Sequence, residues 1–251
     1  MFNLLLVMLF VVGNISCQED ALNLDQIVEK DDLVKFEKIY HSLEIDSPVD
    51  FIDSVTDLKA DKIAKYIIAN VSHKQVARPE SGLLINKLLL KTLFTNLPLA
   101  HNEILRRKLY HLRTRDELGR NILHDLAKQG DLFLLDEIIK TNKSKRVRQV
   151  LNSKDCRGYK PFILTAYNAR KDVAKFLYER GTYLDQKELN DALKIQLSHN
   201  RAEFDYIEYL FEIGIKPQSD LVCGLDSMFG PGAFGNRYTD KSLCTNTCLL
   251  M

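Results

Sequence analysis

The feature that most constrains the fold is an internal repetition in the second half of the chain. Two segments, 116–130 and 155–169, align on Gly119 and Gly158. In each, an aspartate stands three residues before the glycine, an alanine eight residues after it and a small residue eleven residues after it. A second run of apolar residues at helical spacing follows each segment. Such units predict stacked pairs of short helices, because one unit cannot bury its own apolar face.

The first residues of each copy predict a tight turn. Glycine permits the positive φ that such a turn requires, and an aspartate before it hydrogen-bonds to the backbone within the turn. The leucine and alanine positions that follow allow two short helices to approach each other closely.

This pattern resembles the ankyrin repeat, whose sequence is roughly D-x-x-G-x-T-P-L-H-x-A followed by a second helix and a closing glycine. The first copy matches that pattern at Asp116, Gly119, Leu123, His124, Ala127 and Gly130. The second copy matches it at Asp155, Gly158, Pro161, Phe162, Ala166 and Gly181. The resemblance implies that His124 forms local hydrogen bonds around its turn and has a structural role.

The copies also depart from the ankyrin pattern. Asn121 and Lys160 replace the usual threonine, Ile122 replaces proline, and Ile163 replaces histidine. A weaker third unit, 189–214, keeps only the second helix and a closing glycine. The linker between the copies is longer than usual, with Lys140 to Arg148 as the insertion. This basic run is predicted to be an exposed loop, and a nuclear signal or a phosphate-binding patch are the alternatives.

Apolar residues at helical spacing, separated by short breaks, extend from residue 20 to residue 218. We therefore predict an all-α fold, an ankyrin-like helical-repeat solenoid. The expected organisation is a signal peptide over 1–17, a helical region over 18–112 that could hold degenerate repeats, ankyrin-like repeats over 113–218, and a flexible, glycine-rich C-terminal tail over 219–251.

The N-terminus predicts export. Residues 4–12 form an unbroken apolar run, LLLVMLFVV, and small residues including Ser16 follow it. A membrane-spanning helix needs about 20 apolar residues, whereas a short apolar core before small residues is typical of a secretory signal peptide. Cleavage is expected after Ser16 or Cys17. A hydrophobic anchor, a buried first helix or a lipoprotein site at Cys17 are the alternatives, since no lysine or arginine precedes Leu4.

The C-terminus carries a second signal. Cys248-Leu249-Leu250-Met251 matches a prenylation box. Prenylation is cytosolic and the N-terminal signal directs the chain outward, but both can act if an intracellular parasite or symbiont exports the protein into a host cell. The alternatives are an accidental tetrapeptide, or disulfides among Cys223, Cys244 and Cys248 in a secreted structural protein.

The sequence lacks the patterns of common catalytic and cofactor sites. Its six histidines are scattered, and it contains neither a Cys-x-x-Cys pair nor a phosphate-binding glycine loop. The 35 basic and 34 acidic residues give a net charge of +1, which removes the broad basic field typical of nucleic-acid binding. We therefore expect no enzyme activity, no metal, no cofactor and no nucleic-acid partner.

The remaining interpretation is a monomeric protein-binding scaffold, secreted or delivered into a host cell, which meets a membrane only if Cys248 is lipidated. Stacked repeats present an extended face formed by the turns and first helices. The candidate contact residues are those at the turn tips, and simple solvent exposure is the alternative for all of them: Glu117, Leu118, Arg120, Arg157 and Tyr159.

Overall fold

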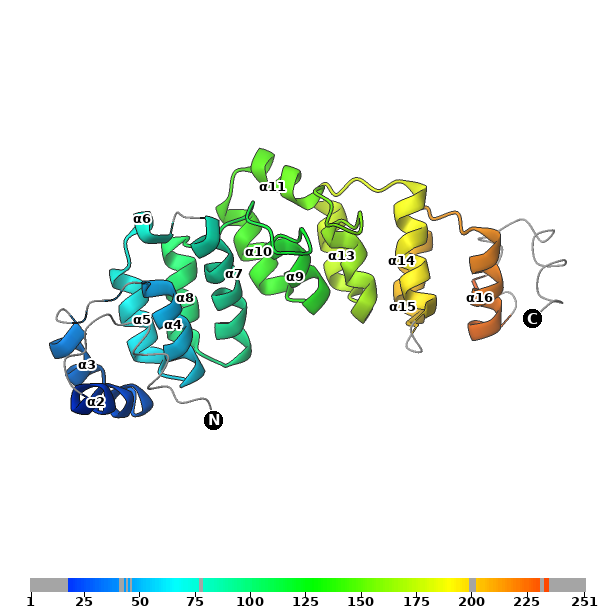
Figure 1. The fold of residues 1–251 in the computed structure, drawn as a ribbon. Helices are drawn as coiled ribbons and strands as arrows, with labels where there is room; N and C mark the ends of the chain where they lie inside the picture. The colour runs from blue at the N-terminus through cyan, green and yellow to red at the C-terminus, as the bar shows by residue number, and fades with distance from the viewer. Residues whose placement is uncertain are drawn as a thin grey trace. The chain divides into compact units, whose positions relative to one another are not determined.

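The computed structural model of the chain describes residues 18–40, 43, 45, 47–76, 79–198, 202–230 and 233–234. Across these residues the secondary structure is helical, with no β-strand, so the predicted all-α class is confirmed (Figure 1). The chain divides into two compact units, Met1–Thr114 and Arg115–Met251, here unit 1 and unit 2. No helix in the described ranges combines the length and apolarity needed to cross a membrane. The predicted signal segment, 1–17, lies outside these ranges.

Unit 1 consists of short helices arranged mainly as consecutive pairs. They are α2 (Gln18–Glu29), α3 (Leu33–Tyr40), α4 (Pro48–Asp57), α5 (Asp61–Asn70), α6 (His73–Val76), α7 (Pro79–Phe94) and α8 (Pro98–Arg107). In each of the pairs α2/α3, α4/α5 and α7/α8 the two helices pack against each other. Helix α5 also packs extensively on α8.

Unit 2 continues with helix pairs and adds two further helices. Its elements are α9 (Ile122–Gln129), α10 (Leu132–Thr141), α11 (Ser144–Leu151), α12 (Pro161–Leu164), the 3₁₀ helix η1 (Thr165–Asn168), α13 (Lys171–Glu179), α14 (Gln186–Ser198), α15 (Phe204–Glu212) and α16 (Ser219–Phe229). The pairs α9/α10, α12/α13 and α14/α15 each pack together.

Five of these pairs, within the described residues, share one connection geometry. A residue with positive φ follows the first helix, and the second helix begins two residues after it. The next N–H along the chain donates to a carbonyl five residues earlier, as in a Schellman motif. The residues with positive φ are Asp31, Lys59, Asn96, Gly130 and Ala169. The same local geometry therefore recurs in both units.

An aromatic cluster fills the first part of unit 1. Phe36 of α3 is fully buried, and its ring stacks on Phe51 of α4 at 6.2 Å between centroids. Tyr66 of α5 meets Phe36 edge-on at the same separation. These aromatic rings join three consecutive helices, and burial of such rings dominates core energetics.

Part of the predicted C-terminal tail is ordered, so the prediction of a flexible tail is wrong for residues 219–229. They form α16, which packs on α14. Leu221, Val222 and Leu225 are buried because their spacing places them on one helical face. Phe234 is also buried and stacks on Phe204 at 4.6 Å. Residues 231–232 and 235–251 lie outside the described ranges.

The predicted basic loop, Lys140 to Arg148, is also corrected. Lys140 belongs to α10, and residues 144–151 form the additional helix α11. The helix forms because Val147, Val150 and Leu151 lie on one face and are buried, while the charged residues point outward.

Candidate partner-binding surface

The first turn of unit 2 precedes α9 and is held by Asp116. Its Oδ1 accepts hydrogen bonds from the backbone N–H groups of Leu118 at 3.0 Å and Arg120 at 2.7 Å. The Asp116 carbonyl accepts from Gly119 N at 2.9 Å, and Gly119 has φ of +71°. The predicted roles of aspartate and glycine in this turn are therefore confirmed.

The second turn precedes α12 and repeats these bonds 39 residues later. Asp155 Oδ1 accepts from Arg157 N and Tyr159 N, both at 2.9 Å. The Asp155 carbonyl accepts from Gly158 N at 2.9 Å, and Gly158 has φ of +83°. Two segments with different side chains thus form the same turn because they share the aspartate and glycine.

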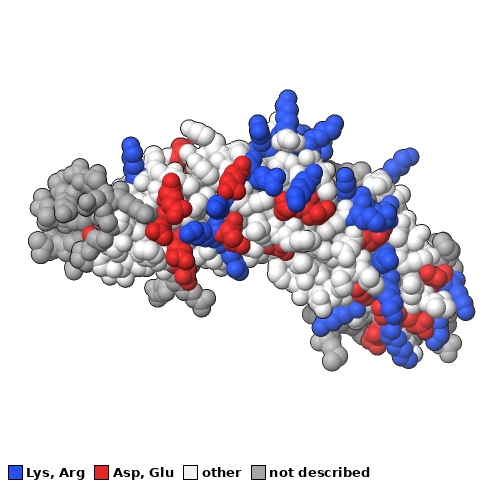
Figure 2. All heavy atoms as spheres, turned by 180° about the vertical axis from the view of Figure 1, so that it is seen from behind, with Lys and Arg blue, Asp and Glu red and all other residues white. Residues whose placement is uncertain are grey.

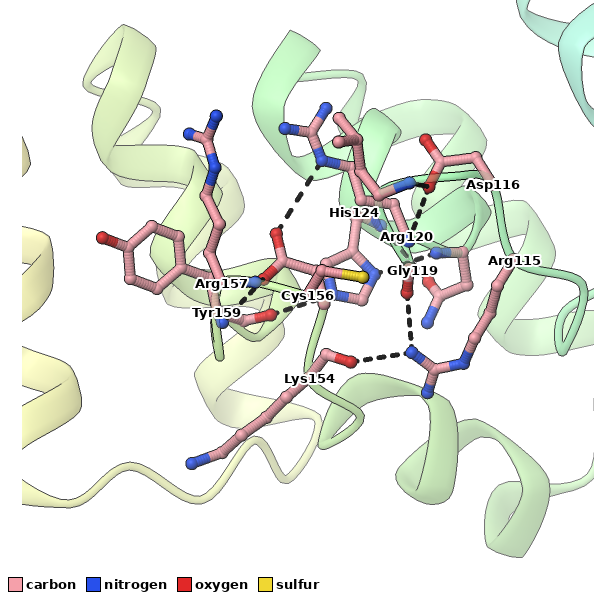
Figure 3. A network of polar contacts seen from close by, with 12 residues as sticks. Arg115, Asp116, Gly119, Arg120, His124, Lys154, Cys156, Arg157 and Tyr159 are labelled. Carbon is pink, nitrogen blue, oxygen red and sulfur yellow. Dashed lines mark hydrogen bonds and ion pairs between the residues drawn. The ribbon is translucent and has the colours of Figure 1, made fainter.

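The two turns are bonded directly to each other (Figure 3). Cys156 N donates to the Leu118 carbonyl at 2.9 Å. Arg115 Nη1 donates to the carbonyls of Gly119 at 2.6 Å and Lys154 at 2.7 Å. A Cβ on Gly119 would lie 2.9 Å from Cys156 Sγ. Close approach and positive φ therefore both require glycine at the first turn.

His124 of α9 forms a hydrogen bond to the backbone of the second turn. Its Nδ1 accepts from Asn121 N at 3.2 Å, which leaves Nε2 to donate to the Tyr159 carbonyl at 3.1 Å. Burial lowers the pKa of His124 to about 4, despite the opposing effects of the Tyr159 carbonyl and the Asp155 carboxylate. His124 is therefore neutral near pH 7, and its predicted structural role is confirmed.

At the two positions where the ankyrin pattern has threonine, the side chains of Asn121 and Lys160 form hydrogen bonds to later elements of unit 2. Asn121 caps α9 through Leu123 N and also donates to Ser153 Oγ at 2.8 Å. The equivalent Lys160 is buried, and its Nζ donates to the Tyr183 carbonyl at 2.6 Å and to Glu188 Oε2 at 2.8 Å. Asn121 therefore keeps a local cap and adds a longer contact, whereas Lys160 makes no side-chain cap and reaches only the following elements.

The structure brings the five predicted contact residues together on the two bonded turns, but does not expose them equally. Glu117, Leu118 and Arg157 are exposed, with Leu118 at 44 %. Tyr159 is half-buried. The three exposed side chains are the ones that a partner can reach without any rearrangement of the turns.

Arg120 is the exception among the five. Its side chain is only 14 % exposed, and its Nε lies 3.8 Å from Asp155 Oδ2. It therefore connects the first turn to the second and contributes mainly to their structure. Arg115, which was not among the predicted contact residues, is exposed and bonds to both turns. Its alignment with Lys154, one repeat later, was the available signal.

The remaining predicted site lies elsewhere. The proposed lipidation residue Cys248 and its neighbour Cys244 fall outside the described ranges, whereas Cys223 lies half-buried on α16. Within the described residues, no group of three histidine, cysteine or carboxylate side chains is arranged to hold a metal ion.

We compared the chain with protein-family models and with curated proteins. No protein-family model matches the chain, and no curated protein matches it.

Proposed function

We propose that this chain is an ankyrin-like helical-repeat solenoid that acts without catalysis and binds another protein through the paired turns of unit 2. One observation carries the proposal: two turns with the same hydrogen bonds are joined by the Cys156 N–Leu118 carbonyl bond. This joint fixes the backbone of both turns while Glu117, Leu118 and Arg157 remain exposed. A rigid platform with exposed tips favours binding because little conformational entropy is lost when a partner docks.

Site-specific photo-crosslinking tests this proposal even while the partner is unidentified. A photoreactive residue is introduced at Leu118 or Arg157 in the full chain, expressed in eukaryotic cells. Matched controls carry it at Lys175 of α13 or Lys194 of α14, which are also exposed but lie outside the turns. We expect a discrete protein adduct from the turn positions alone. The same adducts from all four positions, or none from the turns, would contradict a binding role for this surface.

We further propose that the protein is exported through residues 1–17 and acts as a host-directed effector. The apolar run of residues 4–12 together with the box at Cys248 supports this proposal. A secreted structural protein with C-terminal disulfides and a cytosolic scaffold prenylated at Cys248 are the alternatives.

The intact mass of the protein after expression in eukaryotic cells separates these proposals. Loss of the residues up to Ser16 or Cys17 with an unmodified C-terminus supports secretion. A retained N-terminus with a farnesyl group on Cys248 supports the tethered scaffold and contradicts a cleaved signal peptide. A mass deficit of two hydrogens per cysteine pair, removed by reductant, identifies disulfides.

A further inference from the structure

Helix α11 presents an exposed cationic face on unit 2. Val147, Val150 and Leu151 hold the helix to unit 2 and are buried. Its outward positions include Lys145, Arg146 and Arg148, all exposed, and the exposed Lys143 directly precedes the helix. The helix lies at the edge of unit 2, beyond the ends of α9 and α10 (Figure 1).

The charges on this face lack counter-charges. Between Glu137 and Asp155 the sequence contains no acidic residue. Asp136 of α10 pairs with Lys140 and Arg180, so that carboxylate is already engaged. Among the described residues, the four cations of this face form no ion pair with any carboxylate. Figure 2 shows Lys and Arg side chains gathered where α11 projects.

The side-chain hydrogen bonds at the C-terminal end of α11 do not involve these cations. The C-terminal end of α11 is fixed by other groups: Asn152 Nδ2 donates to the Gly181 carbonyl at 3.0 Å, and Tyr183 N donates to Asn152 Oδ1 at 2.8 Å. Three like charges on a short helix and a fourth directly before it repel one another. An external anionic surface would reduce this repulsion.

We infer that α11 is a docking surface for an anionic lipid bilayer. In Figure 2 the basic side chains at this place protrude from the surface, so they can reach a flat surface whose negative head groups move beneath them. An acidic peptide would instead need a groove or paired bidentate sites to fix its course. No large apolar side chain of α11 is exposed, so the contact is electrostatic and peripheral.

This surface would matter most together with a lipid anchor. A single acyl or prenyl chain gives only marginal, reversible membrane binding, and a polybasic patch supplies the second contribution that stable anchoring requires. The vesicle binding of α11 itself needs neither Cys248 lipidation nor a protein partner.

Vesicle flotation of the full, unlipidated chain tests the inference. The probes are phosphatidylcholine vesicles with and without about 30 mol% phosphatidylserine, at about 0.1 M and about 1 M salt. One variant carries Lys143→Gln, Lys145→Gln, Arg146→Gln and Arg148→Gln. A matched variant of equal net charge carries glutamine at four exposed lysines elsewhere in unit 2: Lys175, Lys187, Lys194 and Lys216.

The wild type and the matched control should float with the anionic vesicles at low salt and release them at high salt. A cation near an anionic surface adds roughly fivefold to binding, and at least two of the four should reach the surface at once. The α11 variant should therefore lose about 25-fold or more in partitioning. Unchanged thermal melting would show that the variant is folded, since all four side chains are exposed.

Three results would overturn the inference. Equal losses in the two variants would indicate a general charge effect, and equal binding to neutral vesicles would indicate apolar insertion by another segment. Tighter binding of polyglutamate or RNA, dependent on the same four residues, would assign α11 to a different class of partner.

Discussion

Units 1 and 2 end their helices with the same backbone geometry but use different residues to do so. Unit 2 places glycine in the left-handed conformation at Gly130, Gly181 and Gly214, with alanine there at Ala169. Unit 1 places Asp31, Lys59, Asn96 and Lys108 there instead. A left-handed L-residue costs about 1–2 kcal/mol, which aspartate and asparagine bear more easily than lysine does. Unit 1 therefore forms the same helix pairs without the glycines that would have indicated them in the sequence.

The units also differ in how neighbouring helix pairs are joined. In unit 1, Asp31 accepts from Lys62 N and Ile63 N at the start of α5. Asp61 likewise accepts from the first N–H groups of α8, those of Leu99 and Ala100. Unit 2 instead joins its turns by a backbone bond, buried side chains and close packing. Unit 1 therefore depends on single carboxylates, whereas unit 2 depends on the conformation of its turns.

Acid should weaken unit 2 through His124, and this is the largest expected effect. The pKa of His124 is about 4 when folded and about 6.5 when unfolded. The unfolded chain therefore binds the proton first as pH falls, and stability is lost below about pH 6.5. The loss should reach about 3 kcal/mol near pH 4. Urea unfolding of the wild type and of His124→Gln, compared across this range, isolates the contribution. Parallel pH profiles for the two proteins would refute the assignment.

Substitution at Gly119 should cost more than the same substitution at Gly158. Both have positive φ, but only at Gly119 would a Cβ meet Cys156 Sγ and the Cys156 backbone. Gly119→Ala should lower the free energy of unfolding by about 2–3 kcal/mol and Gly158→Ala by about 1 kcal/mol. Urea unfolding and hydrogen exchange across residues 115–160 measure both. Equal losses would show that the contact between the turns is unimportant.

Removing the Asp61 carboxylate should weaken the contact between α5 and α8 in unit 1 and leave unit 2 unaffected. Asp61→Ala leaves two N–H groups of α8 without their acceptor and should cost about 1–2 kcal/mol. Asp61→Asn retains one acceptor oxygen and should cost less. Hydrogen exchange of the first turn of α8 should rise in the alanine variant. A rise of similar size throughout unit 2 would contradict the local origin of the effect.

The smallest effect should be a gain in unit 1. Lys59→Gly removes the left-handed strain of a side chain, with φ of +60°, but adds backbone entropy to the unfolded state. The net stabilisation should be about 0.5 kcal/mol. Lys59→Ala serves as the control, because alanine bears the same strain and should leave the melting temperature nearly unchanged. A gain in the alanine variant would point to the charge rather than the backbone.

The all-α class and both turns were predictable because their signals are local. Helical spacing marks the helices, and Asp116 and Asp155 build their turns with residues within four positions. The helix connections of unit 1 were not recognised as related, since Lys59 and Asn96 occupy the positions where glycine was the expected signal. Arg120 was expected to face a partner, but its ion pair depends on Asp155, which no local pattern of the first turn reveals.

Composition also misled the prediction in two segments. The glycine content of the C-terminal region concealed the apolar face of α16, although Leu221, Val222 and Leu225 have helical spacing. The lysines and arginines of α11 suggested a loop, whereas Val147, Val150 and Leu151 were sufficient to indicate a helix. In both segments the decisive signal was the spacing of three apolar residues.

The fixed spacing inside each helix pair has a consequence for how such a chain can change in length. From the left-handed residue to the second helix the interval is two residues in five of the six described pairs, α14/α15 being the exception. The segments between pairs differ in length, and in two cases they contain an extra helix, α6 or α11. An added peptide at Gly130 would shift α10 out of register with its partner, but the same peptide after Asn142 would only lengthen a segment that already varies. Growth by insertion, whether in evolution or in the placement of an internal tag, is therefore confined to the junctions between pairs.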